Sequence, residues 1–280
     1  MWDLEHGNPA PVSSPFASVG RASSSFGAAA SLAIKEAAAE FDISYTIPSA
    51  CARALAEGTA DIGIIPAAAY TSIPDLLIIP DVAIAARNDV RSILLVSKMP
   101  IEQVRTVALD NSSLTSVALT KILFAKWLGG ARDYKPMTPN LDAMLSFCDA
   151  ALIIGDPALQ IDRAQYFTLD LAEEWVARTG KSFVFAFWAI RAQSLEGRDK
   201  AAIVKAFKES RDQGVSPKNL ETIAQEWAPR LGISIESIRI YLTQNIHYYL
   251  DPPSLEGLAL YYRLGAEIGA LPSVPPLRFL

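Results

Sequence analysis

From Phe41 onward, short apolar runs alternate with helical segments, and this alternation limits the chain to few folds. Strands are expected at residues 43–46, 61–66, 76–79, 82–86, 92–97, 106–109, 151–154 and 183–190. Helices are expected at 49–57, 114–128, 141–147 and 170–179, followed by three or four more at about 198–213, 217–230, 234–249 and 253–268. Strands alternating with helices predict an α/β protein with mostly parallel sheets and a helical C-terminal part.

Composition narrows the chemistry. The 280 residues suffice for one large or two modest domains, and the net charge of −5 opposes general binding of nucleic acid. The two histidines, His6 and His247, and the two cysteines do not form a zinc-binding spacing. An enzyme built from this chain is therefore expected to use no metal, no cofactor, no imidazole and no thiolate. Cys51 and Cys148 lie in amphipathic helical stretches and are expected to be buried thiols in a reducing compartment.

The first thirty residues are rich in Ala, Ser and Pro and contain no continuous apolar core of a secretory signal. Nowhere does an apolar run reach the roughly 18 residues that a membrane-spanning helix needs. The sequence therefore predicts an irregular N-terminal segment, no membrane span and a cytoplasmic location.

Small hydroxyl residues cluster where a buried strand ends and a long helix begins, at residues 108–117. The helix start offers free backbone N–H groups and a partial positive charge, to which Ser113, Thr115 and Ser116 add hydroxyl donors. This arrangement predicts a site for a carboxylate or a phosphate. The simpler alternative is N-capping of the helix by Ser112 or Ser113.

Arg91 and Ser92 stand where a loop enters another buried strand. Arg91 is suited to bind a carboxylate through two hydrogen bonds, although a solvated loop charge explains it equally simply. Ser92 begins the apolar strand and is expected to present its hydroxyl to a pocket.

Three further candidates follow from their places in the strand pattern. Gly155 and Asp156 follow a strand, and the carboxyl ends of parallel strands are where α/β sheets bind ligands. Asp156 is expected to orient a substrate hydroxyl or to act as an acid/base group; the alternative is that it caps a helix ahead of Pro157. Tyr70 follows another strand end and is expected to line a cleft. Phe183 belongs to an aromatic strand that either packs in the core or reaches a planar ligand.

Residues 42 to about 262 resemble the periplasmic-binding-protein-like enzymes of the futalosine route to menaquinone. The order and spacing of the matching segments make the resemblance specific across some four-fifths of the chain. The segments are Ile47-Pro48-Ser49 and residues 55–66, 90–97, 107–119, 150–159, 170–175 and 179–188.

The resemblance implies a two-lobed fold of the type II periplasmic-binding-protein kind. Lobe 1 would hold residues 1–95 and 195–280, lobe 2 would hold 96–194, and the substrate would bind between them. The implied reaction removes water from the dicarboxylate chorismate and gives 3-[(1-carboxyvinyl)oxy]benzoate. Ser92 stands at the Ser of the family's Val-x-Ser-Val motif and is the implied catalytic hydrogen-bonding group. The implied substrate-binding residues are Ser49, Tyr70, Arg91, Ser113, Thr115, Ser116, Gly155, Asp156 and Phe183.

The chain also departs from the family pattern. The family's first strand ends in a Tyr-Leu-Asn-type motif whose Asn points into the cleft, and no such motif occurs in residues 9–35. Ala69 replaces a usual Glu, and Ser182 replaces a usual Pro. The missing Asn predicts weak or absent turnover.

Two alternatives to an enzyme that removes water from chorismate stay open. One is a protein that binds small carboxylates without catalysis. The other is the sister lyase that forms 1,4-dihydroxy-6-naphthoate, which uses a histidine in its second lobe; the absence of histidine between His6 and His247 disfavours it.

Overall fold

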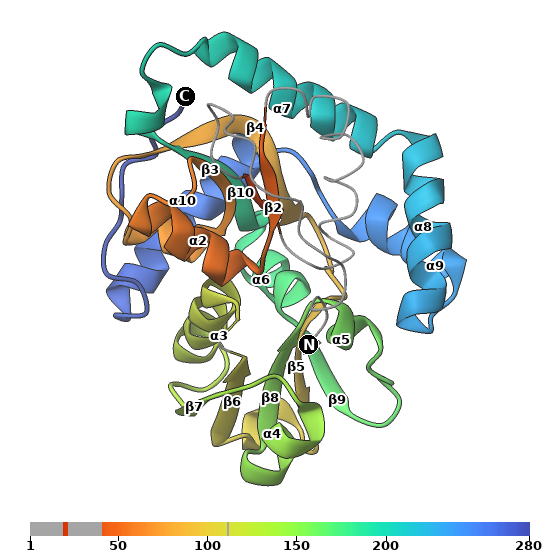
Figure 1. The fold of residues 1–280 in the computed structure, drawn as a ribbon. Coiled ribbons are helices and arrows are strands. Elements are labelled where there is room, and N and C mark those ends of the chain that lie inside the picture. Colours follow the sequence, from red (N-terminus) through yellow and green to blue (C-terminus); the bar gives the residue numbers. More distant parts are fainter. Residues whose placement is uncertain (1–18, 22–40, 111) are drawn as a thin grey trace.

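The computed structural model describes residues 19–21, 41–110 and 112–280. Two five-stranded sheets organise these residues, and in the view of Figure 1 one sheet lies above the other. The strand order is β2-β1-β3-β10-β4 in the first sheet and β7-β6-β8-β5-β9 in the second.

The first sheet contains β1 Val19–Arg21, β2 Ile43–Tyr45, β3 Ile62–Pro66, β4 Leu76–Ala86 and β10 Phe183–Arg191. β1 runs parallel to both β2 and β3, whereas β10 runs antiparallel to both β3 and β4. Two strands expected at 76–79 and 82–86 form the single strand β4. Between them Asp81 has a φ of 65°, and the register against β10 shifts there.

The second sheet contains β5 Ile93–Ser97, β6 Thr106–Asp110, β7 Asp133–Met137, β8 Ala150–Ile154 and β9 Phe167–Asp170. β6 is parallel to β7 and β8, and β5 is antiparallel to β8 and β9. β7 and β9 are not among the expected strands. β7 is a largely exposed edge strand containing Pro136, so its sequence lacks the apolar pattern of the buried strands.

The expectation of mostly parallel sheets is wrong, since both sheets are mixed. Alternation of strands and helices predicts parallel pairing only where a helix returns the chain to the same sheet. Here β4 leads directly into β5 of the other sheet, and α6 (Leu171–Thr179) leads back into β10 of the first. β5 and β10 therefore enter their sheets antiparallel to their neighbours. The expected boundary of lobe 2 at residue 194 is also wrong for β10, because residues 183–191 pair with β3 and β4.

The sequence signals for helix ends are confirmed at several helices. α2 begins at Pro48 and ends before Gly58, whose φ is 75°, and Asp170 caps α6 by accepting backbone N–H groups. The remaining helices are α3 Leu114–Lys126, α4 Leu141–Phe147, α5 Asp156–Leu159, α7 Lys200–Gly214, α8 Pro217–Leu231, α9 Ile235–Ile240 and α10 Pro252–Glu267, with short 3₁₀ turns η1 Ala67–Thr71, η2 Ile101–Gln103 and η3 Ala192–Leu195. Within the described ranges no helix is both long and apolar enough to span a membrane.

An aromatic cluster ties the two sheets together. α3 and α6 contact strands of both sheets, and Figure 1 shows them between the sheets. Trp175 of α6 packs edge-to-face on Phe183 of β10, with ring centroids 5.3 Å apart, and Tyr261 of α10 packs on Phe183 at 5.2 Å. These rings are buried, so their packing fixes α6 and α10 against β10 of the first sheet.

The N-terminal and C-terminal parts differ from their expected structures. Val19–Arg21 form β1 inside the segment expected to be irregular; the rest of that segment, including His6, lies outside the described residues. The helix expected over 234–249 ends early. α9 continues into a π-helix, η4 (Tyr241–Asn245), after which the backbone of His247 exchanges two hydrogen bonds of 2.8 Å with Ala85. A sheet partner distant in sequence has overridden the local helical pattern.

Asp251 links the end of β4 to the start of α10. Its carboxylate caps α10 by accepting from Ser254 N at 3.0 Å, and it also binds Arg87 at 2.6 Å and His247 at 2.8 Å. Partial burial acts to raise the pKa of Asp251, but the hydrogen bonds from Ser254, Arg87 and His247 outweigh it and hold this pKa well below the ordinary value.

We expect Asp251→Asn to lower the urea midpoint at pH 7, and the difference from the natural protein to shrink as pH falls below about 4. The sign follows because a carboxylate with a lowered folded-state pKa stabilises the fold above its unfolded-state pKa and loses this effect on protonation. Urea unfolding at pH 7, 5, 4 and 3 measures the difference. Asp142→Asn, at an exposed position in α4, is the control; a difference for Asp251→Asn that stays constant with pH contradicts the account.

Candidate active site

The segment 87–92 carries the chain from the first sheet to the second, and its geometry is held by one buried carboxylate. Arg91 has a φ of 60°, a left-handed conformation that costs a non-glycine residue free energy. The Asp170 carboxylate accepts the backbone N–H of Val90 at 3.1 Å and that of Arg91 at 2.6 Å. It also accepts the N–H of Ala172 at 3.0 Å, so the same group caps α6 and fixes the strained turn. Burial raises the pKa of Asp170, while its backbone hydrogen bonds act in the opposite direction.

Ser92 lies at the end of this turn and is fully buried. The Tyr241 hydroxyl donates to Ser92 Oγ at 3.1 Å, and the N–H of Gly155 donates to the Ser92 carbonyl at 2.7 Å. The structure therefore brings together the predicted residues Ser92 and Gly155. It adds Tyr241, which the sequence pattern placed in a packing helix.

Arg91 supplies positive charge beside Ser92. Its side chain is half-buried, and no ion pair or hydrogen bond of its guanidinium occurs within residues 41–110 and 112–280. Arg163 is a second cation at this turn, 3.8 Å from the Asp170 carboxylate. The turn thus carries a guanidinium that has no partner among the described residues, followed in the chain by a serine hydroxyl, and both are groups that bind carboxylates.

The hydroxyl cluster at the start of α3 has a structural role, as the N-capping alternative predicted, and its role as an anion site stays a prediction. Ser113 is the N-cap: its Oγ accepts from Ser116 N at 3.3 Å and lies 3.0 Å from Ser116 Oγ. Thr115 Oγ1 accepts from Ala68 N at 3.1 Å and donates to Phe185 O at 3.0 Å. Thr115 and Ser116 are buried, and the hydrogen bonds of these three hydroxyls are made to the protein itself.

Tyr70 and Phe183 also have structural roles. The Tyr70 hydroxyl donates to Pro276 O and accepts from Arg278 N, each at 3.1 Å, which anchors the C-terminal segment. Phe183 is buried and enclosed by the aromatic cluster, as the core alternative predicted, and its contact with a ligand stays a prediction. Ser49 is half-buried in the first turn of α2, and Asp156 begins α5; their binding roles stay predictions.

Sequence reasoning passed over Asp110, a buried carboxyl at the end of β6. Ser112 N donates to its Oδ1 at 2.9 Å. Burial raises the pKa of Asp110, and the hydrogen bonds from Ser112 oppose this shift. The available signal was a lone acid ending an apolar strand, at the edge where such sheets place ligands.

The other titratable groups offer less chemistry. Cys51 and Cys148 are buried, as expected, and form no disulfide; burial raises the pKa of Cys51 to about 12, so its thiol is inert at neutral pH. Among the residues that the structure describes, no three His, Cys, Asp or Glu side chains are grouped so as to hold a metal ion.

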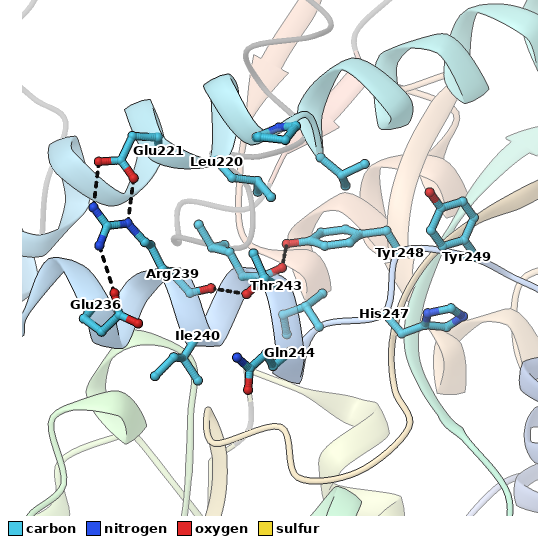
Figure 2. Close-up of a pocket in the computed structure, with 14 residues that line it drawn as sticks. Leu220, Glu221, Glu236, Arg239, Ile240, Thr243, Gln244, His247, Tyr248 and Tyr249 are labelled. Atoms are coloured by element: carbon cyan, nitrogen blue, oxygen red, sulfur yellow. Dashed lines mark hydrogen bonds and ion pairs between the residues drawn. The ribbon is translucent and has the colours of Figure 1, made fainter.

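A groove of about 690 Å³ lies between α8 and the segment 239–249, away from the predicted site residues (Figure 2). Arg239 crosses its wall and binds Glu221 at 2.6 Å and Glu236 at 2.8 Å. None of the predicted site residues lines this groove, although three residues of η4, Leu242, Thr243 and Gln244, do. Neither Ser92 nor Tyr241 is among the residues that line the groove.

Comparison with solved structures identifies the architecture. A crystal structure of an Archaeoglobus fulgidus protein matches with a TM-score of 0.72 at 16% identity, covering 91% of this chain and 98% of that one. The periplasmic aliphatic sulphonate binding protein of Escherichia coli matches with a TM-score of 0.62 at 18% identity, covering 94% of each chain. The chain has an α/β periplasmic-binding-protein-like fold.

Comparison of sequences identifies the family. A Thermus thermophilus protein named chorismate dehydratase is 30% identical over 253 residues, which cover 84% of this chain and 89% of that protein. The model of a family described as menaquinone biosynthesis matches residues 8–267, nearly the whole chain. The chain belongs to the menaquinone biosynthesis family.

Proposed function

We propose that this protein is a cofactor-free chorismate dehydratase, a hydro-lyase that forms 3-[(1-carboxyvinyl)oxy]benzoate for menaquinone biosynthesis. The observation that carries the proposal is the 30% identity, over 84% of the chain, to a protein of that name. The turn at residues 90–92 supports it, because the guanidinium of Arg91 has no partner within the described part of the chain and the Ser92 hydroxyl follows it in sequence.

The reaction suits such a site. A ring C–H bond loses its proton, the neighbouring C–O bond breaks, and water leaves as the ring becomes aromatic. Because aromatisation drives the elimination, positioning and hydrogen bonding are sufficient contributions from the protein. Arg91 would bind one of the two substrate carboxylates, and Ser92 would hydrogen-bond the substrate at the reacting end.

The proton acceptor in this proposal is the enolpyruvyl carboxylate of the substrate itself. Asp110 and Asp170 are buried, and their carboxylates already accept backbone N–H groups that hold the local loops, so the proposal assigns the proton transfer to neither. We expect an analogue without this carboxylate to bind and yet to resist dehydration. Normal elimination of water from that analogue contradicts the substrate-assisted step and means that a group of the protein takes the proton.

The test is incubation of the purified protein with chorismate, with the product quantified by chromatography and ultraviolet absorbance beside a protein-free control. We expect slow product formation above the control rate, because the family's N-terminal Asn motif is absent. Turnover at a normal enzymatic rate contradicts the expected slowness and leaves the dehydratase function standing. Absence of both product and binding contradicts the function.

The missing Asn motif also favours a second candidate, a small-carboxylate binding protein that has kept the cleft and lost the chemistry. A thermal-shift titration with chorismate separates the two. A rise in melting temperature without product supports the binding protein, and a rise with product supports the dehydratase.

A further inference from the structure

Tyr241 is the residue that contacts the Ser92 hydroxyl, from a segment 149 positions further along the chain. Both side chains are buried, and the phenol donates its hydrogen to Ser92 Oγ at 3.1 Å. A serine hydroxyl has one proton to donate and two lone pairs to accept with. With one lone pair occupied by Tyr241, the rotation of the Ser92 hydroxyl is restricted and its own proton is directed away from the phenol.

The segment carrying Tyr241 is a π-helix, a rare backbone form that occurs frequently at functional sites. Its wide turn is closed by the hydrogen bond from Ile246 N to Tyr241 O at 3.2 Å. Tyr241 contacts Ser92, and Asn245 Nδ2 donates to Asp89 O at 3.2 Å. Both ends of η4 thus contact the segment that crosses between the sheets.

Further hydrogen bonds join η4 to the residues on either side of it in the chain. Figure 2 shows Thr243 Oγ1 donating to Arg239 O at 2.7 Å and Tyr248 donating its hydroxyl to Leu242 O at 3.1 Å. Arg239 is itself held by Glu221 and Glu236. These contacts limit the movement of η4, so the Tyr241 hydroxyl is presented to Ser92 from a fixed position.

We infer that Tyr241 is a positioning residue for Ser92: it orients the serine hydroxyl so that the serine proton points to the substrate. The inference rests on the proposed dehydratase function and extends it to a residue of the C-terminal part of the chain. Tyr241 acts through Ser92 and needs no contact with the substrate. Its removal therefore affects the rate of the chemical step more than substrate binding.

The test compares Tyr241→Phe with Tyr262→Phe. Tyr262 is the matched control, since its hydroxyl is also buried and donates one hydrogen bond of 2.8 Å, in its case to Ala67 O. We expect Tyr241→Phe to lower kcat on chorismate about tenfold with less than a twofold change in KM. We expect Tyr262→Phe to lower the melting temperature about as much as Tyr241→Phe does and to leave kcat unchanged.

The double variant gives the decisive comparison. If Tyr241 acts through Ser92, Ser92→Ala combined with Tyr241→Phe is as slow as Ser92→Ala alone. Provided that the natural protein forms product, two results overturn the inference: the losses in kcat of the two single variants multiply in the double variant, or Tyr241→Phe has an unchanged kcat.

If the natural protein neither forms product nor binds chorismate, the proposed function fails and the inference fails with it. If it binds chorismate without turnover, the dehydratase function fails, and the inference, which concerns the chemical step, fails with it.

Discussion

Replacing Ser92 with alanine is expected to lower kcat on chorismate about 100-fold, the largest loss that we predict for a single hydroxyl. Ser92 is buried at the end of the turn that crosses between the sheets, and its hydroxyl is oriented by Tyr241. Such a pre-positioned donor stabilises charge that develops on the departing oxygen without the reorganisation that water needs. The measurement is product formation under single-turnover conditions, with the folded state of each variant checked by thermal unfolding.

Ser97→Ala is the control for this loss. Ser97 is buried at the end of β5, the strand that follows Ser92, and its hydroxyl donates to Met99 O at 2.8 Å. Its removal should cost about 1 kcal/mol of stability and leave kcat unchanged. Equal activities of the Ser92→Ala and Ser97→Ala variants are the result that removes Ser92 from the mechanism.

Asp170→Ala is expected to lower the free energy of unfolding by about 3–4 kcal/mol, because it leaves buried backbone N–H groups without their acceptor. The Asp170 carboxylate serves Val90 and Arg91 in the strained turn and Ala172 in the first turn of α6. Without it, the left-handed turn at Arg91 loses the acceptor of two backbone N–H groups and keeps the hydrogen bond from Ser92 N to Val90 O at 2.7 Å. We therefore also expect turnover to fall, since Ser92 follows this turn directly.

Asp199→Ala is the matched variant for Asp170→Ala. Asp199 caps α7 by accepting from Ala201 N at 2.9 Å and Ala202 N at 3.2 Å, and these hydrogen bonds are exposed. An exposed cap of this kind is worth about 1 kcal/mol. Urea unfolding at pH 7 compares the variants, and losses of equal size would show that Asp170 is only a helix cap.

The sequence predicted the strands and helices that depend on local patterns. Pro48 and Gly58 mark the two ends of α2, and the apolar run Ile62–Pro66 is fully buried in the first sheet. The direction of β5 and β10 escaped prediction, because it depends on which sheet the chain enters next. The end of the helix predicted over 234–249 could not be predicted for a similar reason, since it depends on the backbone hydrogen bonds that His247 forms with the distant Ala85.

The candidate site was predicted only in part. Ser92, Arg91 and Gly155 were identified by their places at strand ends, and the structure groups them around one turn. The structural role of Thr115 could not be predicted, because a hydroxyl at a helix start has the same sequence signature whether it binds a ligand or, as here, the backbone of η1 and β10. Tyr241 was missed because its role depends on a contact 149 residues away.

The rate at which the purified protein converts chorismate to 3-[(1-carboxyvinyl)oxy]benzoate, measured beside its Ser92→Ala variant, tests the central claim most directly. The account predicts product above the protein-free rate for the natural protein and a rate about 100-fold lower for the variant. Product formation that is the same with the natural protein, with the variant and without protein would contradict it.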